Sequence, residues 1–280
     1  PNLTTLGSGS VRKDGEIVGI AVAVEGWSGY YPIAHEGGGN IDKKITLDWF
    51  KDVLRTPATK IFHNAMYDVS WIRSLGFKIN GQIIDTMIAA SLVNENRLRY
   101  NLDSLAKEYV GIGKSEKLLY EAAKEWGVNP KKEMWRLPAM HVGEYAEQDA
   151  VATLKLWERL KQEITAQDLW DIFNVETELF PCLVDMKFKG VRVDLEKAHK
   201  IKKDLIKEEK QYLKKIKNET GLDVEIWAAA SIAKIFDKLK LPYDRTQTGA
   251  PSFTKNFLSQ HPNEVAQAIA QSREINKAHT

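Results

Sequence analysis

Apolar positions along the chain follow two spacings, one typical of strands and one typical of helices. Alternation at every second residue, beside glycines, predicts strands over residues 17–24 and 29–33. Spacing of three and four residues predicts a helix over residues 46–54. Short apolar runs at 61–62 and 83–84 each lead into a further helical pattern. Short strands that alternate with helices predict an α/β fold.

Polar side chains stand where the apolar run at 61–62 gives way to a helix. Asn64 and Asp68 are four residues apart in this stretch, so they share one face of the helix. In α/β proteins, ligands bind beside the carboxyl ends of strands, where the following helices begin. We therefore expect this amide and this carboxylate to belong to a functional site.

A second pair of this kind lies on a later helix. Tyr145 and Asp149 stand one turn apart at the edge of an amphipathic pattern. Each pair alone is short enough to occur by chance, and capping with helix-surface pairing would also account for it. The order and separation of the two pairs favour a shared site. The apolar stripe of the later helix comprises Val142, Ala146, Ala150, Thr153, Trp157, Leu160 and Ile164.

With the segments IIDTMIAASLV at 83–93 and LRYNLDSLAKEYVG at 98–111, the two pairs resemble the DEDD family of 3′–5′ exonucleases in its tyrosine-bearing branch. The match is to the proofreading domain of family A DNA polymerases of the DNA polymerase I type, from phages or bacteria. This resemblance implies an RNase H-like α/β domain over residues 1–174, with a mixed central sheet flanked by helices. It also implies a monomer that acts on DNA in the cytoplasm of a bacterium or a phage-infected host.

The resemblance implies a role for each residue of the two pairs. Asp68 and Asp149 would bind two divalent ions, Mg²⁺ or Mn²⁺, which prefer clustered carboxylates. Tyr145 would orient the attacking water, since a phenol with an ordinary pKa near ~10 is a poor base. Asn64 would hydrogen-bond the terminal nucleotide. Arg99 would bind the phosphates at the end of the DNA strand. A surface salt bridge that adds little stability would account for this arginine equally well.

Three further acidic residues fit structural roles better than catalytic ones. Asp85 precedes a helix and fits an N-cap. Asp14 and Glu16 have the spacing of the family's first acidic motif, but Asp14-Gly15 before a β-branched run is typical of a hairpin turn. In the family, that motif lies on a strand upstream of this hairpin. We therefore expect the chain to start just after the strand that carries this motif, which is a central strand of the sheet in the family. We expect this 280-residue form to cleave DNA weakly or not at all.

After residue 174 the pattern changes to that of a mainly helical region. Leu179, Leu183 and Met186 have apolar helix spacing, and a strand over 191–193 and a helix over 195–217 follow. Residues 175–280 resemble the entry to the palm and then the thumb of a family A polymerase, whose thumb helices lie along duplex DNA. The loop TQTGAPS at 246–252 would lie near the DNA backbone, or it is a plain Gly/Pro loop with a serine N-cap. Palm carboxylate motifs are absent, so we do not expect nucleotide addition.

Composition is that of an ordinary globular protein, with 43% hydrophobic and 28% charged residues and a net charge of +2. The charge is uneven, because residues 196–217 hold nine lysines against four acids. A solvated helix face or a surface that follows phosphates would explain this excess. The single cysteine, Cys182, excludes an internal disulfide and is expected in the core. No run of 18 apolar residues predicts a membrane span.

Two other functions remain open at this point. The tyrosine branch also includes RNA-trimming exonucleases of the ribonuclease D kind, although their tail is usually a small helical module. If the two acidic residues of the family's first motif are absent, the chain would be a non-catalytic editing fold that only binds primer-template DNA. The charged segment 114–135 indicates no function.

Overall fold

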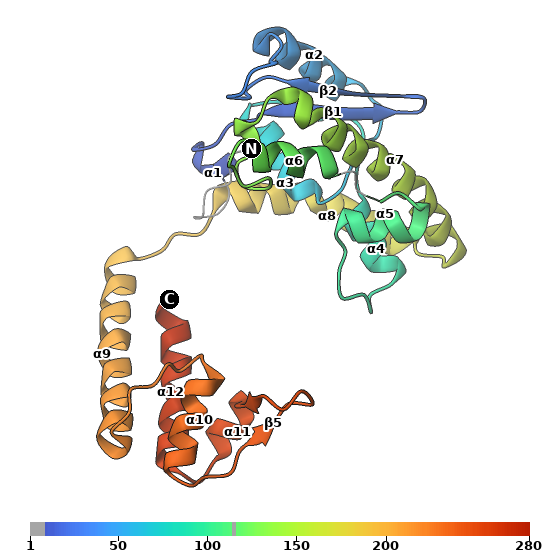
Figure 1. The fold of residues 1–280 in the computed structure, drawn as a ribbon. Coiled ribbons are helices and arrows are strands. Elements are labelled where there is room, and N and C mark those ends of the chain that lie inside the picture. The colour runs from blue at the N-terminus through green and yellow to red at the C-terminus, as the bar shows by residue number, and fades with distance from the viewer. Residues whose placement is uncertain (1–8, 114–115) are drawn as a thin grey trace. The chain divides into compact units, whose positions relative to one another are not determined.

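The computed structural model describes residues 9–113 and 116–280. The chain divides into two compact units, one that ends at Gly190 and one from Val191 to Thr280 (Figure 1). Within the described residues, none of the helices combines the length and the apolar character that a bilayer span needs.

The first unit contains short strands and helices in alternation, as the apolar pattern predicts. Two 3₁₀ turns, Met134–Arg136 and Ala139–His141, lead into its longest helix. Its other elements are α1 (Gly9–Arg12), β1 (Gly19–Val24), β2 (Trp27–Pro32), α2 (Lys43–Arg55), β3 (Lys60–Phe62), α3 (Ala65–Ser74), β4 (Ile83–Asp85), α4 (Thr86–Val93), α5 (Leu102–Val110), α6 (Lys117–Glu125), α7 (Gly143–Ala166) and α8 (Trp170–Lys189).

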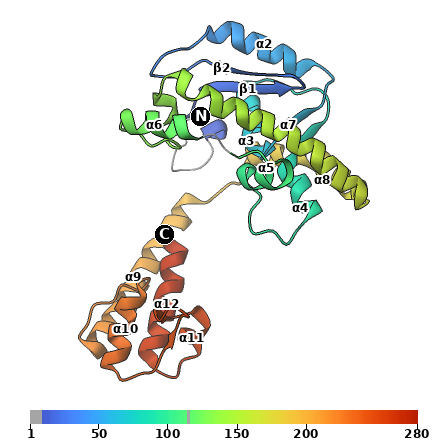
Figure 2. The ribbon, with the colours of Figure 1, turned by 45° about the vertical axis from the view of Figure 1, so that its right-hand side comes forward.

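The predicted hairpin is present. Strands β1 and β2 pair antiparallel from Gly19 opposite Pro32 to Val24 opposite Trp27, and the turn uses Gly26 at φ 77°. Helix α2 covers one face of this hairpin and α7 the other (Figures 1 and 2). The hairpin is thereby held between two helices.

Strands β3 and β4 form a separate parallel pair, with Phe62 opposite Asp85. Within the described residues the hairpin and this pair are not hydrogen-bonded to each other. The expectation of one continuous mixed sheet is therefore corrected to small two-stranded sheets in a mostly helical α/β domain. Helices rather than a central strand connect the two pairs, because β1, β2 and β3 all pack against α7.

Helix α7 is the centre of the first unit's core. Leu156, Leu160 and Ile164 are fully buried against α4, α5 and α8. The predicted stripe is largely correct, since Val142, Thr153, Trp157, Leu160 and Ile164 are buried, and Ala146 and Ala150 are half-buried. The same helix therefore carries both the core and the Tyr145–Asp149 pair.

Helix α8 buries a different face from the one that its sequence predicts. Phe173, Phe180 and Val184 are buried against other elements of the first unit. Cys182 is exposed, so its expected place in the core is wrong. An apolar outer stripe of α8 also remains exposed, and it consists of Ile172, Val175, Leu179, Leu183 and Met186.

The predicted boundary between residues 174 and 175 falls inside α8, a single helix that packs against α3, α4 and α7. The compact first unit therefore extends to Gly190. The functional boundary at 174 that the family resemblance implies remains a prediction.

The second unit is mainly helical, with a core that includes Ile216 of α9, Phe236 of α10 and Ile269 of α12. Residues 191–193 form no strand, contrary to expectation. The start of α9 is exposed at Ile201. The elements are α9 (Leu195–Thr220), α10 (Ala229–Lys238), β5 (Asp244–Arg245), β6 (Pro251–Ser252), α11 (Lys255–Gln260) and α12 (Glu264–His279).

The loop at 246–252 forms an exposed turn between β5 and β6. The Thr246 N–H donates to the Ala250 carbonyl at 2.8 Å, and Gly249 adopts φ 84°. Ser252 lies in β6, and Thr254 rather than Ser252 is the N-cap of α11. The serine N-cap that we considered is therefore wrong.

Candidate active site

The first half of the candidate site is the junction between β3 and α3. Strand β3 ends at Phe62, and Asn64 turns the chain into α3 with a left-handed backbone, φ 61° and ψ 57°. Asn64 and Asp68 follow one turn apart, as the sequence predicts, and each residue as a whole is exposed. An amide and a carboxylate are thus available to a ligand at the end of a strand.

The carboxylate of Asp68 is costly to ionise. Desolvation by the surrounding protein raises its pKa to about 7, and the negative charge of Asp85 adds to this effect. The residue as a whole is nevertheless exposed at the surface. A raised carboxylate pKa at an accessible position is typical of sites that bind a cation or transfer a proton.

Asp85 supports this junction from the neighbouring strand. Its carboxylate accepts the backbone N–H of Met87 at 2.8 Å, which confirms the predicted N-cap of α4. The same carboxylate accepts the N–H groups of Asn64 and Ala65. The sequence did not predict this second role, because it arises only from the pairing of β3 with β4.

The second half of the site lies on α7. Tyr145 is hydrogen-bonded to Asp149, and burial together with the Asp149 charge raises the pKa of the Tyr145 phenol above its ordinary value. The ring of Tyr145 packs against a buried cluster that includes Leu119 of α6 and Val142. The segment 116–135, to which the sequence assigned no function, thereby forms the wall behind the phenol.

Asp149 also lies beside the start of α5. A small cavity of about 10 Å³ is lined by Asp149 and Gln148 of α7 and by Leu102 and Asp103 of α5, among others. The Gln148 amide donates to the Gly113 carbonyl at 2.8 Å and ties α7 to the end of α5. The start of α5 and Asp149 thus line the same small cavity.

Arg99 lies in the loop before α5 and is exposed. Its neighbour Arg97 forms a two-pronged ion pair with Glu108, with N–O distances of 2.6 Å. Arg99 itself has no partner among the ion pairs of the described residues. Its guanidinium therefore remains available for an anionic ligand, near the helix that borders Asp149.

The structure thus forms each predicted pair locally. Asn64 stands with Asp68 on α3, and Tyr145 bonds with Asp149 on α7. Strand β3, which leads into Asn64, packs against α7. The convergence of Asp68 and Asp149 on shared metal ions remains a prediction.

Residues 9–113 and 116–280 contain no cluster of three or more acidic, histidine or cysteine side chains arranged to hold a metal. Asp68 and Asp149 supply two carboxylates of a suitable type, not a full ligand set. Asp14 and Glu16 do not add to it, because Asp14 pairs with Arg12 and Glu16 pairs with Lys43. The rejection of Asp14 and Glu16 as ligands remains a prediction.

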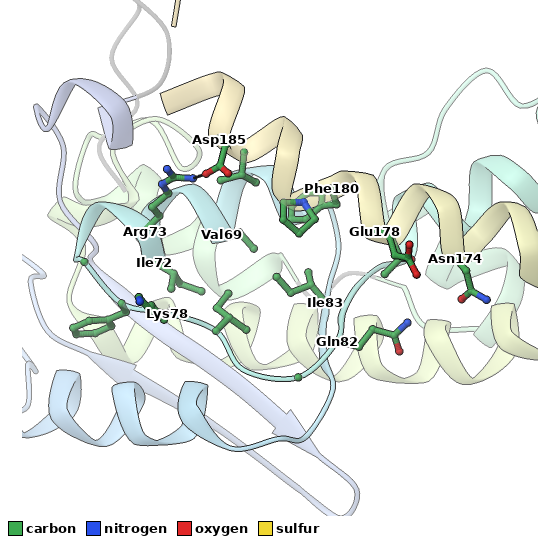
Figure 3. Close-up of a pocket in the computed structure, with 17 residues that line it drawn as sticks. Val69, Ile72, Arg73, Lys78, Gln82, Ile83, Asn174, Glu178, Phe180 and Asp185 are labelled. Atoms are coloured by element: carbon green, nitrogen blue, oxygen red, sulfur yellow. Dashed lines mark hydrogen bonds and ion pairs between the residues drawn. The ribbon is translucent and has the colours of Figure 1, made fainter. Parts of the chain in front are cut away.

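A larger cavity of about 740 Å³ lies between α3, the segment 76–83 and α8 (Figure 3). None of the predicted site residues lines it. Two basic and two acidic side chains line the cavity, so it has no net positive charge with which to bind a polyanion such as DNA. It is lined mainly by apolar side chains, including Val69, Ile72, Ile83 and Phe180, and by the polar residues Arg73, Lys78, Gln82, Asn174, Glu178 and Asp185.

Comparison with known proteins identifies the family. Residues 8–165, more than half of the chain, match the family DNA_pol_A_exo1, described as 3′-5′ exonuclease. The chain belongs to this family of exonuclease domains in family A DNA polymerases. The family assignment made from the two residue pairs is therefore confirmed.

Relatives extend the similarity beyond the exonuclease domain. The DNA-directed DNA polymerase of Pseudomonas phage M6 is 32% identical over 288 residues, which cover 100% of this chain and 43% of the phage protein. DNA polymerase DpoZ of Salmonella phage PMBT28 is 30% identical, over 92% of this chain and 43% of its own length. DNA polymerase I of Pseudomonas aeruginosa is 26% identical, and the match covers 95% of this chain and 30% of that polymerase. The exonuclease chain therefore spans less than half the length of these relatives.

A solved structure shares the fold. The POL domain of Pol1 from M. smegmatis, in complex with DNA primer-template and dNTP, matches with a TM-score of 0.62 and 18% identity. The match covers 94% of this chain and 42% of that chain. At this identity the likeness concerns the fold alone.

Proposed function

We propose that this chain is the proofreading part of a longer DNA polymerase, removing nucleotides from the 3′ end of DNA in a bacterial or phage-infected cytoplasm. The observation that carries the proposal is the pair of local sites inside the matched exonuclease segment, Asn64 with Asp68 and Tyr145 with Asp149. Residues 1–174 would be the exonuclease domain and 175–280 the start of the palm and thumb.

The reaction is hydrolysis of the last phosphodiester bond. Water attacks the phosphorus, the bond from phosphorus to the 3′ oxygen breaks, and that oxygen takes up a proton. The products are a nucleoside 5′-monophosphate and a DNA strand one nucleotide shorter. A frayed 3′ end reaches such a site more easily than a paired end, because unpairing costs a few kcal/mol.

Three side chains hold the substrate and the water. The exposed amide of Asn64 hydrogen-bonds the terminal nucleotide, and Arg99 pairs with a phosphate. Tyr145 stays protonated, because its pKa is raised, so its phenol orients the water as a hydrogen-bonding group and does not act as a base. Asp149 holds the phenol in place.

Asp68 and Asp149 would hold the divalent ions, with other oxygen ligands completing the coordination. Two bound ions, Mg²⁺ or Mn²⁺, supply a nucleophilic water and stabilise the charge on the leaving oxygen. Ionisation of Asp68 near pH 7 favours cation binding above that pH, because only the ionised carboxylate is a good ligand.

The second unit would bind duplex DNA as a thumb. Five exposed lysines of α9 recur at intervals of three and four residues, so they share one face, opposite the buried Ile216. A row of cations about one helical turn, ~5.4 Å, apart suits a phosphate backbone. The five are Lys200, Lys203, Lys207, Lys210 and Lys214.

The proposal is tested with labelled single-stranded DNA and RNA of one sequence, with Mg²⁺, with Mn²⁺ or with a chelator. We expect metal-dependent shortening of the DNA from its 3′ end, at a low rate because the described residues supply only two carboxylates. Asp68→Ala and Asp149→Ala should each abolish it. The matched control is Asp48→Ala on the exposed face of α2, which should cleave at the unchanged rate.

Other outcomes separate the alternatives. Faster shortening of RNA would favour an exonuclease of the ribonuclease D kind. Binding of DNA without cleavage under every metal condition would favour a non-catalytic editing fold. A protein that neither binds nor shortens DNA would overturn the proposal.

A further inference from the structure

A helix begins with backbone N–H groups that lack partners within the helix. An asparagine at the N-cap normally accepts one of them with its own side chain. In α3, Asn64 occupies this position but makes no side-chain cap hydrogen bond. The asparagines that begin α5 and α12 behave differently, since Asn101 accepts from Ser104 and Asn263 accepts from Val265.

The partner for the start of α3 comes from another element. Asp85, at the end of β4, accepts the Asn64 N–H at 3.0 Å and the Ala65 N–H at 2.8 Å, one with each carboxylate oxygen. The oxygen that serves Asn64 also accepts the Met87 N–H at 2.8 Å. Asp85 is 6% exposed. One buried carboxylate therefore caps two helices.

The chemistry of this arrangement requires a side chain that offers hydrogen-bond acceptors to all three donors. Three N–H donors converge on Asp85, and a carboxylate offers acceptors only. An asparagine at the same place would turn its NH₂ group toward at least one of these donors. A buried N–H without an acceptor is unfavourable, so the substitution is not conservative here.

The same contacts hold Asn64 in a conformation that side chains rarely adopt. Left-handed backbone is uncommon outside glycine, although asparagine tolerates it better than most residues. The strand register, with Phe62 opposite Asp85, brings the carboxylate to the junction. The Thr86 hydroxyl donates to the Phe62 carbonyl at 3.1 Å and ties the two strand ends together a second time.

We propose that Asp85 is a positioning residue that caps α3 in place of Asn64 and so leaves the Asn64 amide free to bind the nucleotide at a 3′ end. The nucleotide as ligand rests on the proposed function. The capping itself rests on the hydrogen bonds alone. These two parts can fail separately, and the experiments below distinguish them.

The first experiment measures the amide hydrogen exchange of Asn64 and Ala65 by NMR and needs no activity. In Asp85→Asn, exchange at these two amides should accelerate at least tenfold. The control is Asp42→Asn, which alters another N-cap aspartate, the one that accepts from Ile45 at the start of α2. Unchanged exchange in Asp85→Asn would overturn the capping role.

A second variant decides the matter even if Asp85→Asn does not fold. Asn64→Gly removes an amide that does no capping and places glycine where the backbone is left-handed. It should melt at or above the temperature of the unaltered protein. Asn101→Gly, at an asparagine that caps α5, should melt below it. A clear drop for Asn64→Gly would contradict the proposal.

The third experiment measures binding of a single-stranded DNA oligonucleotide with a free 3′ hydroxyl, in chelator to prevent cleavage. Asn64→Gly and Asp85→Asn should each weaken binding about fivefold, the typical effect of one hydrogen bond. The double variant should bind no more weakly than Asn64→Gly, because both changes remove the same contact. Losses that multiply, or none from Asp85→Asn, would overturn the positioning role.

Failure of the proposed function gives a different result. An unaltered protein that does not bind the oligonucleotide would refute the nucleotide as ligand. Faster exchange at Asn64 and Ala65 in Asp85→Asn, absent in Asp42→Asn, would still establish that Asp85 caps α3.

Discussion

The phenol of Tyr145 is hydrogen-bonded to the carboxylate of Asp149, one turn further along α7. The ring of Tyr145 packs against α6, and Asp149 lies beside α5. A hydroxyl held by a carboxylate in this way can orient a water molecule, whereas a phenylalanine ring of the same shape cannot.

We expect Tyr145→Phe to slow metal-dependent cleavage of single-stranded DNA about tenfold or more, because the water loses its orienting group. Binding of the oligonucleotide in chelator should not change. The measurement is a single-turnover time course with labelled DNA. The control is Tyr120→Phe, a nearby tyrosine of α6 that is 43% exposed. Equal rates for Tyr145→Phe and the unaltered protein would remove the tyrosine from the mechanism.

Asp68 should make the protein less stable as pH rises. Its pKa is about 7 in the folded chain, against ~3.9 expected when unfolded. Between these values the folded state binds the extra proton, so the free energy of unfolding falls as pH increases. Asp68→Asn removes this effect and should melt a few degrees higher than the unaltered protein at pH 8, with the difference vanishing near pH 4.

Melting temperatures across this pH range, measured without divalent ions, check the prediction. Asp48→Asn, on the exposed face of α2, provides the control and should leave the pH dependence unaltered. A lower melting temperature for Asp68→Asn at pH 8 would show that the ionised carboxylate stabilises the fold instead.

In helix α8, alanine substitutions of two neighbouring residues should change stability by very different amounts. Phe173 is fully buried and stacks on Trp157 at 5.4 Å between ring centroids, whereas Ile172 is 42% exposed. Phe173→Ala should lower the free energy of unfolding of the first unit by about 3–5 kcal/mol. Ile172→Ala should change it by less than about 1 kcal/mol. Urea denaturation followed by tryptophan fluorescence measures both, and similar losses would contradict this packing of α8.

The lysine face of α9 predicts salt-dependent DNA binding. Reversing Lys203, Lys207 and Lys210 to glutamate should weaken binding of duplex DNA at least tenfold and reduce the slope of log affinity against log salt by about 3. Titrations at several salt concentrations measure both quantities.

The matched control carries the same charge change elsewhere. Lys44, Lys51 and Lys78 are exposed in the first unit, and their reversal to glutamate should leave the salt slope nearly unchanged. If both triple variants lose affinity equally, the net charge rather than the α9 face governs binding.

The sequence predicted the elements that depend on local periodicity. The hairpin, the turn from β3 to α3 and the long helix α7 were found close to their expected bounds. The pairs Asn64–Asp68 and Tyr145–Asp149 follow from helical spacing alone, so they could be found without a structure. The N-cap of Asp85 also followed from its local sequence.

Features that depend on contacts between distant elements could not be predicted. Apolar spacing in α8 fits two faces, and only the packing against the first unit decides that Phe180 is buried while Leu179 is exposed. The second role of Asp85 depends on strand register, which no local pattern reveals. For the same reason, spacing along the chain does not establish how Asp68 and Asp149 lie relative to each other.

The outer stripe of α8 has a practical consequence for work with the isolated protein. Cys182, the single cysteine of the chain, is exposed on the same helix as these apolar side chains. A fluorophore attached there would need no engineered mutation, and its emission would respond to any surface that shields this part of the helix from water. The polypeptide thus contains its own attachment point for a probe of this surface.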